Sequence, residues 1–363
     1  MASPSPAMGT RSIPMATDRA RPRLVAGWLL ACCALVFAMI VVGGVTRLTH
    51  SGLSITEWQP IVGSLPPLSA AEWESAFAKY QATPEYKLVN HGMSLAEFKG
   101  IFWWEFFHRL LGRLIGAAFL VPFVWLLARG AIPKGYGRKL GAIFVLGALQ
   151  GALGWYMVKS GLVDDPRVSQ FRLTAHLALA VAIFGAMLWL AMSLLDRHPD
   201  ADAQATEASP RRFGNGVVAL VFLMIVTGGF VAGIRAGFAY NTFPLMNGHL
   251  VPPEAMLLSP WWKNLFYNMA TVQLDHRIVA LALAIAVPWL WWRVQRTSVA
   301  TGRARVGAHA LLAALALQIA LGIATLVNVV PLALAALHQA GAVLVFALSL
   351  NLAHALRRSG RDL

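Results

Sequence analysis

The feature that most constrains the fold of this chain is a series of eight apolar runs. Each is close to the roughly 20 residues that an α-helix needs to cross a bilayer. The runs cover residues 24–45, 101–128, 138–158, 171–195, 214–235, 268–292, 304–327 and 333–356. Because 58% of the residues are hydrophobic and only 13% are charged, the composition excludes a soluble globular protein. The sequence therefore predicts an all-α integral membrane protein with eight transmembrane helices in contact with membrane lipid.

The basic residues are distributed unevenly along the chain, which carries a net charge of +14. They cluster in the N-terminal tail, in the connections after the second, fourth and sixth runs, and after the last run. Loops rich in Lys and Arg stay on the cytoplasmic side, so we expect cytoplasmic N and C termini and place loops 46–100 and 236–267 on the outer side. This distribution explains the charge without a nucleic-acid partner, and we expect none.

Residues 1–23 contain no apolar core of their own, which favours a cytoplasmic tail over a cleaved signal peptide. A mitochondrial transit peptide is the alternative, but Asp18 and the short length count against it. We therefore expect a multi-pass protein of the bacterial inner membrane, with the mitochondrial inner membrane as the less favoured location.

The chain contains an internal repeat. "VVGGVTRLTHSGL" in the first run matches "IVTGGFVAGIRAGF" in the fifth, "EFFHRLLGRLIG" matches "QLDHRIVALALA", "LQGALG" matches "LQIALG", and "AHLALAVAIF" matches "LHQAGAVLVF". Both copies begin on the same side, so the repeat is parallel. We expect two pseudo-symmetric four-helix bundles, 24–195 and 214–356, joined by a polar cytoplasmic linker, 196–213, and followed by a short cytoplasmic tail, 357–363.

Four of the ten histidines occupy equivalent depths. His108, His176, His276 and His338 each lie about five to nine residues into an even-numbered run, roughly 8 to 13 Å below the outer surface. Two facing imidazoles per bundle is the arrangement that axial ligation of a haem iron requires. The alternative for each is a hydrogen-bonded packing residue. The other six are expected to be solvated or interfacial: His50, His91, His198, His249, His309 and His354.

Small residues follow the histidines at helical spacing: Gly112 and Gly116 after His108, and Ala280 and Ala284 after His276. They would leave a shallow groove for a planar macrocycle, although small residues also let helices pack closely. Arg109 and Arg277 follow the histidines directly and are candidate partners for haem propionates. The alternative is that both snorkel to lipid headgroups.

The two halves differ at charged positions beside the histidines: Glu105 has no charged counterpart, and Arg113 has only Leu281 opposite it. Glu105 stands three residues before His108, on the same helical face, whereas Gln273 stands three residues before His276. A carboxylate beside a bound macrocycle can exchange protons or stabilise a developing cation, and an amide cannot. We therefore expect the chemistry in the N-terminal half. Its outer loop, 46–100, is the longer one, and its Trp, Pro and Tyr content predicts an ordered cover with short helices, either a lid over a substrate pocket or an interfacial cap.

These motifs together resemble the haem A synthase family. The resemblance rests on "GGVTRLTHSGLSITEWQPIVGSLPP", "WWEFFHRLLGR", "TAHL", "LDHR" and "LHQAGA", covers residues 24–356, and is greatest to the branch found in mitochondria and related bacteria. Some members carry a cysteine pair in the outer loops, which this chain lacks, so no thiol role is transferred.

The resemblance implies an enzyme that oxidises the C8 methyl group of haem O to a formyl group, giving haem A for terminal oxidases. It implies that His276 and His338 ligate a resident haem b cofactor. It also implies that His108 and His176 hold the substrate haem, and that Glu105 is the catalytic residue near the reacting methyl. An electron donor or acceptor, a haem O synthase and a second copy of the chain are further expected partners.

Three other functions remain open from the sequence. A di-haem b cytochrome would carry electrons without altering its haems. A haem transporter or chaperone would exchange haem without changing it. A transporter without haem would bind no pigment.

Overall fold

The computed structural model describes residues 20–57, 62–162, 166–196, 208–298 and 300–357. Over these residues the chain is helical and contains no strand beyond one isolated β-bridge. Eight helices are long and apolar enough to cross a membrane, as the sequence predicts. They are α1 (Pro22–Leu48), α4 (Leu95–Ala128), α5 (Tyr136–Lys159), α6 (Gln170–Leu195), α7 (Ala208–Gly233), α9 (Met269–Arg296), α10 (Gly302–Val327) and α11 (Leu332–Ala355).

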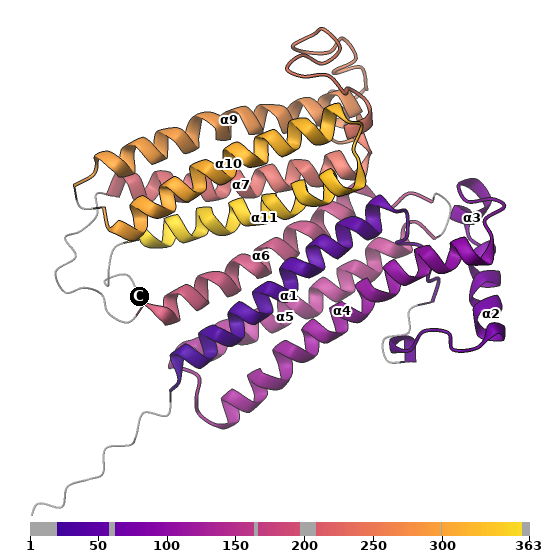
Figure 1. The fold of residues 1–363 in the computed structure, drawn as a ribbon, viewed down its shortest axis with the longest axis horizontal. Coiled ribbons are helices and arrows are strands. Elements are labelled where there is room, and N and C mark those ends of the chain that lie inside the picture. The colour runs from indigo at the N-terminus through magenta and orange to yellow at the C-terminus, as the bar shows by residue number, and fades with distance from the viewer. Residues whose placement is uncertain (1–19, 58–61, 163–165, 197–207, 299, 358–363) are drawn as a thin grey trace, which may run out of the picture.

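The long helices form two groups of four, which lie side by side in Figure 1. In the N-terminal group, neighbouring helices make a closed ring in the order α1, α4, α5, α6. The C-terminal group repeats this ring in the order α7, α9, α10, α11. The groups meet through α6 with α7, α1 with α11, and α6 with α11. Because α6 corresponds to α11 and α1 to α7, these contacts are those expected of two copies related by a twofold axis between them.

The first and last described residues lie at one end of the molecule, opposite the loops 46–100 and 236–267 (Figure 1). We call the end with these two loops the outer end, after the side on which the sequence predicts them. Two boundaries differ from the sequence prediction. Helix α4 begins at Leu95 rather than at residue 101, because a Ser94–Glu97 capping box starts it earlier. Helix α7 begins at Ala208, inside the predicted linker. Most of that linker (197–207) and most of both predicted tails (1–19 and 358–363) fall outside the described residues.

Equivalent positions of the two repeats touch at the outer end of this interface. The Arg47 Nη2 atom donates to the Ala232 carbonyl at 2.6 Å, and Arg235 Nη2 lies 3.0 Å from His50 Nδ1. Each pair is separated by 185 residues, the offset that aligns "VVGGVTRLTHSGL" with the fifth run. Residues related by a twofold axis can touch one another only near that axis. These contacts therefore place the axis between α1 and α7.

His50, which was expected to be solvated or interfacial, lies half-buried just after the end of α1. Burial, together with the neighbouring Arg235 and Arg47, lowers the pKa of His50. The neutral imidazole that results can accept a hydrogen bond from Arg235.

An ion-pair network joins the two groups at the opposite end. Asp196, which follows α6, pairs with Arg303 of α10 at 2.9 Å and with Arg357 after α11 at 2.8 Å. His354 lies beside it, 3.2 Å from Ser193, and only 1% of the residue is exposed. His354, in the last turn of α11, was expected to be solvated or interfacial and is instead buried, because α6 packs against α11 there. His198 lies outside the described residues.

The described residues of the loop 46–100 include the short helices that the sequence predicts: η1 (Val62–Ser64), α2 (Ala70–Gln81) and α3 (Pro84–Leu88). An aromatic cluster attaches it to the first turns of α4. Tyr80 stacks on Phe98 with ring centroids 5.2 Å apart, and Trp73 meets Phe102 edge-on at 4.8 Å. Phe98, Phe102 and Phe106 recur every four residues, so they form one aromatic face on α4. This face explains why α4 extends beyond its apolar run.

The second outer loop contains only η2 (Ala236–Phe238), η3 (Trp261–Lys263) and α8 (Asn264–Tyr267). It lacks a counterpart of α2 and its aromatic cluster among the described residues. The large cover therefore belongs to the N-terminal half alone.

Candidate functional site

The four depth-matched histidines lie on diagonally opposed helices of the two rings. His108 is on α4 and His176 on α6, which are separated by α1 and α5 in the ring order. His276 on α9 and His338 on α11 are separated in the same way by α7 and α10. All four side chains are partly buried. Each half thus brings one imidazole from each of two opposed helices, as the sequence predicts.

Each imidazole packs against a glycine of a neighbouring helix. A Cβ atom on the glycine would lie 3.3 Å or less from the Cε1 atom of the ring, so no larger residue fits without displacing it. The pairs are Gly43 with His108 (3.0 Å), Gly154 with His176 (2.9 Å), Gly228 with His276 (3.3 Å) and Gly322 with His338 (2.8 Å). The sequence analysis missed these glycines as site residues, although they stand in its own repeat motifs.

The Nδ1 atoms of the histidines differ between the halves. His276 Nδ1 lies 2.9 Å from Thr227 Oγ1, and His338 Nδ1 lies 3.0 Å from Gln318 Nε2. The Nδ1 atoms of His108 and His176 are buried and have no hydrogen-bond partner among the described residues. The sequence analysis did not single out Thr227 or Gln318.

Glu105 lies at the outer end of the N-terminal half, 2% exposed, with both carboxylate oxygens hydrogen-bonded. Its Oε2 accepts from Ser54 Oγ at 2.7 Å and from the Ile55 backbone N–H at 2.8 Å. Its Oε1 accepts from Arg109 Nε at 3.0 Å and Nη2 at 2.6 Å. Four donors therefore fix a negative charge about one turn from His108.

Arg109 and Arg277 make similar contacts in the two halves, although within the described part of the chain only Arg109 donates through Nε and only Arg277 also donates to the Pro244 carbonyl. Arg109 also donates to the carbonyl oxygens of Ile55 and Glu57, and Arg277 donates to those of Tyr240 and Thr242. These loop residues correspond to one another in the repeat. Arg277 completes the match by donating to Gln273 Oε1 at 3.1 Å.

The two arginines thus bind their own outer loops rather than extending into lipid. Their interaction with propionates remains a prediction. The structure shows instead that a carboxylate or an amide can occupy the same place beside an arginine.

The small residues beside His108 leave space in part. A Cβ at Gly116 would meet nothing within 4 Å, whereas one at Gly112 would lie 3.3 Å from Met39. Together with imidazoles on opposed helices, each packed against a glycine, this donor set fits axial ligation of a planar haem in each half. It fits an enclosed metal-ion site less well, since the described residues contain no cluster of three or more His, Cys, Asp or Glu ligands.

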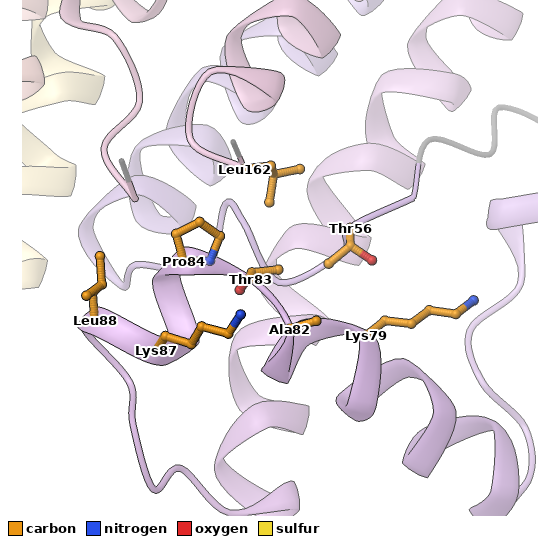
Figure 2. A pocket seen from close by; sticks show the side chains of 8 residues that line it. All are labelled: Thr56, Lys79, Ala82, Thr83, Pro84, Lys87, Leu88 and Leu162. Atoms are coloured by element: carbon orange, nitrogen blue, oxygen red, sulfur yellow. The ribbon is translucent and has the colours of Figure 1, made fainter. Parts of the chain in front are cut away.

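A cavity of about 500 Å³ lies in the outer loop of the N-terminal half (Figure 2). It is lined by Thr56, Lys79, Ala82, Thr83, Pro84, Lys87, Leu88 and Leu162. Neither Glu105 nor any of the four histidines reaches it. The cavity therefore lies between the loop 46–100 and Leu162 of the connection after α5, and whether the cover acts as a lid remains a prediction.

Glu85, in α3, is a second buried carboxyl that the sequence analysis did not predict. It is 4% exposed, and its Oε2 has no hydrogen-bond partner among the described residues. Burial and the neighbouring Glu105 raise the pKa of Glu85 to about 8, against a smaller opposing effect of Arg235. The outer end of the N-terminal half thus holds two acidic side chains.

Comparison with known proteins supports the resemblance seen in the motifs. The model of the COX15-CtaA family, described as cytochrome oxidase assembly protein, matches residues 26–350. The chain is 58% identical over 351 residues to a protein of Nitrosospira multiformis named heme A synthase, covering 96% of this chain and 98% of that one. Proteins of the same name from Nitrosomonas eutropha (53% identical, 90% and 92% covered) and Rhodospirillum centenum (48%, 97% and 92%) also match.

Proposed function

The chain belongs to the COX15-CtaA family of cytochrome oxidase assembly proteins, and from that premise we propose how its two halves divide the work of a haem A synthase. The protein is a multi-pass membrane enzyme of haem A biosynthesis that oxidises haem O. In the proposed division, the N-terminal half binds haem O through His108 and His176. The C-terminal half keeps a haem b through His276 and His338.

The observation that supports this division best is the exchange of Glu105 for Gln273 within otherwise matching arginine contacts. A bundle that only holds a haem needs no fixed negative charge there. In the proposed reaction the C8 methyl is oxidised in two steps, each of which takes up one water and releases two protons and two electrons, the electrons passing to an external redox partner. The first step gives an alcohol and the second a hydrated aldehyde, which loses water to leave the formyl group. Glu105, held by Arg109, Ser54 and Ile55, stabilises positive charge that develops near the methyl carbon.

His276 and His338 orient the resident group, and a haem b bound there supplies one-electron redox chemistry. The outer loop 46–100, docked through its aromatic cluster, limits water access from the outer surface above Glu105. The enzyme would lie in the bacterial inner membrane with both termini cytoplasmic. Its substrate is too apolar to diffuse freely in water, which favours direct transfer from a haem O synthase in the same membrane.

The proposal is tested by incubating purified protein with haem O and a redox partner, and separating the extracted pigments by reversed-phase chromatography. We expect haem b to remain unchanged while haem O is converted to its alcohol and then to haem A. Recovery of protohaem alone would favour an electron-carrying cytochrome. Unchanged haem O would favour a haem transporter or chaperone.

A further inference from the structure

The clearest polar difference between the two histidine pairs concerns the hydrogen-bond partners of their Nδ1 atoms. In the C-terminal half both Nδ1 atoms have a partner, Thr227 for His276 and Gln318 for His338. In the N-terminal half neither Nδ1 atom has one among the described residues.

One of these two differences results from a change of residue type between the repeats. Gln318 has the equivalent Gln150, which also approaches its histidine: its Nε2 lies 2.9 Å from the His176 carbonyl and 3.4 Å from His176 Nε2. Thr227, however, corresponds to Val42, which has no polar side-chain atom. Both residues directly precede the glycine that lets the helix approach the imidazole. Thr227 therefore offers His276 a hydroxyl group, whereas the equivalent Val42 carries a methyl group in its place.

The Thr227 hydroxyl has a defined role in this geometry. Its single proton is donated to the Met224 carbonyl at 2.9 Å, as is common for a threonine inside a helix. Its oxygen can then only accept from the imidazole, so His276 is held with its proton on Nδ1. The Nε2 lone pair is left free to bind iron. Partners of this kind orient a ligating histidine and raise its basicity, and their loss typically costs about 10- to 100-fold in affinity.

We propose that Thr227 is a positioning residue that makes the C-terminal haem site retentive, and that Val42 at the equivalent position keeps the N-terminal site exchangeable. This inference rests on the proposed function, because a site that admits haem O and releases haem A must let go of its ligand. A site for a resident cofactor must instead retain its haem. One hydroxyl, present in one copy of the repeat and absent from the other, accounts for that difference.

The test compares haem loss from Thr227→Val with wild type, because threonine and valine have nearly the same shape and the helix is preserved. Purified protein is mixed with excess apomyoglobin as haem acceptor, and transfer is followed from the Soret band. The midpoint potential of the retained haem is measured in parallel. We expect Thr227→Val to lose its resident haem about 10- to 100-fold faster and to shift its potential. Thr227→Ser, which keeps a hydroxyl at this position, should lose haem at a rate within about 3-fold of wild type.

Two further variants complete the test. Val42→Thr should slow the loss of haem O loaded into the N-terminal half. Thr297→Val, which removes the same kind of hydroxyl-to-backbone bond at the far end of α9, should leave haem loss unchanged.

Equal rates and potentials for Thr227→Val and wild type would overturn the inference while leaving the proposed function intact. A wild-type protein that carries no haem, or that never converts haem O, would instead overturn the proposed function.

Discussion

The N-terminal and C-terminal halves of this protein are built on one helical plan and differ at a few polar positions. Both use a ring of four helices, two histidines on opposed helices, four imidazole–glycine contacts in all, and an arginine that binds its outer loop. They differ in Glu105 against Gln273, in Val42 against Thr227, and in the large cover. The shared features are those that would place a haem, and the differences are those that would decide what happens to it.

The arginine contacts show that the exchange of Glu105 for Gln273 leaves the surrounding hydrogen bonds largely the same. Arg109 and Arg277 donate to equivalent loop carbonyls, and each also donates to the side chain four residues earlier. Replacing a carboxylate with an amide in that place alters the charge but not the shape of the site. A duplicated scaffold can therefore separate retention from catalysis through single side chains.

The largest expected effect comes from removing the ligands of each half in turn. His276→Ala or His338→Ala should strongly lower the Soret absorbance of the purified protein, because each removes one of the two imidazoles proposed to ligate the resident haem iron. His108→Ala should purify with its resident haem and fail to bind added haem O. Absorption spectra before and after adding haem O make the measurement. Equal haem loss in His108→Ala and His276→Ala would break the comparison between the halves.

Exchanging the acidic position should separate turnover from haem content. We expect Glu105→Gln to lower the rate of haem A formation by at least about 100-fold, since it removes the fixed charge proposed to act in the reaction. Haem b content should stay at the wild-type level, because Gln273 shows that an amide fits beside the arginine. The matched control is Gln273→Glu, which should not raise turnover. Normal haem A output from Glu105→Gln would remove this residue from the mechanism.

The glycines that face the histidines give a moderate effect that differs between the halves. Gly154→Ala should raise the KM for haem O about 10-fold, because the new methyl would lie 2.9 Å from His176 Cε1 and displace the ring. Gly322→Ala should instead weaken retention of the resident haem. Gly151→Ala, on the same helix as Gly154, is the control, since its added methyl meets nothing within 4 Å. Steady-state kinetics and haem content distinguish the outcomes, and equal KM values for Gly151→Ala and Gly154→Ala would contradict the account.

The smallest effect concerns the cover, which only the N-terminal half has. The pKa of Glu85 is raised to about 8 by burial and by Glu105, so its folded-state pKa exceeds that of the unfolded chain. The stability that protonated Glu85 gives to the folded cover is fully present below about pH 4.5. It is lost as the pH rises through 8, which lowers the free energy of unfolding of the cover by on the order of a few kcal/mol.

Hydrogen exchange of α2 and α3 should therefore speed up between pH 6 and 9, after correction for the intrinsic pH dependence of exchange. The second outer loop, 236–267, serves as internal reference. Glu85→Gln should remove the dependence, and a dependence that persists in this variant would assign it to another group.

Much of the architecture could be predicted from the sequence, because hydrophobic length and repetition are local properties. The eight spans and the grouping of the helices into two rings of four follow from them. The early start of α4 was missed because its first turns are stabilised by the aromatic cluster with Tyr80 and Trp73, not by an apolar run. His354 was misjudged because its burial depends on two helices that are distant in sequence.

The candidate site was predicted only as far as residue type and spacing allow. His108, His176, His276, His338 and Glu105 could be named from the repeat. The Glu105–Arg109 pair joins residues one turn apart, but its closure by Ser54 and Ile55 depends on how the loop folds back. Thr227 and its contact with His276 were missed because a threonine inside an apolar helix carries no distinctive pattern until its neighbour is known.

The central claim, that one half keeps a haem and the other processes one, is tested most directly by locating iron in the protein itself. Anomalous diffraction at the iron edge, from crystals grown with and without added haem O, would do so. The account predicts one iron between His276 and His338 in the resting protein, and a second between His108 and His176 only after haem O is added. Iron confined to the N-terminal half, or present at neither pair, would contradict it.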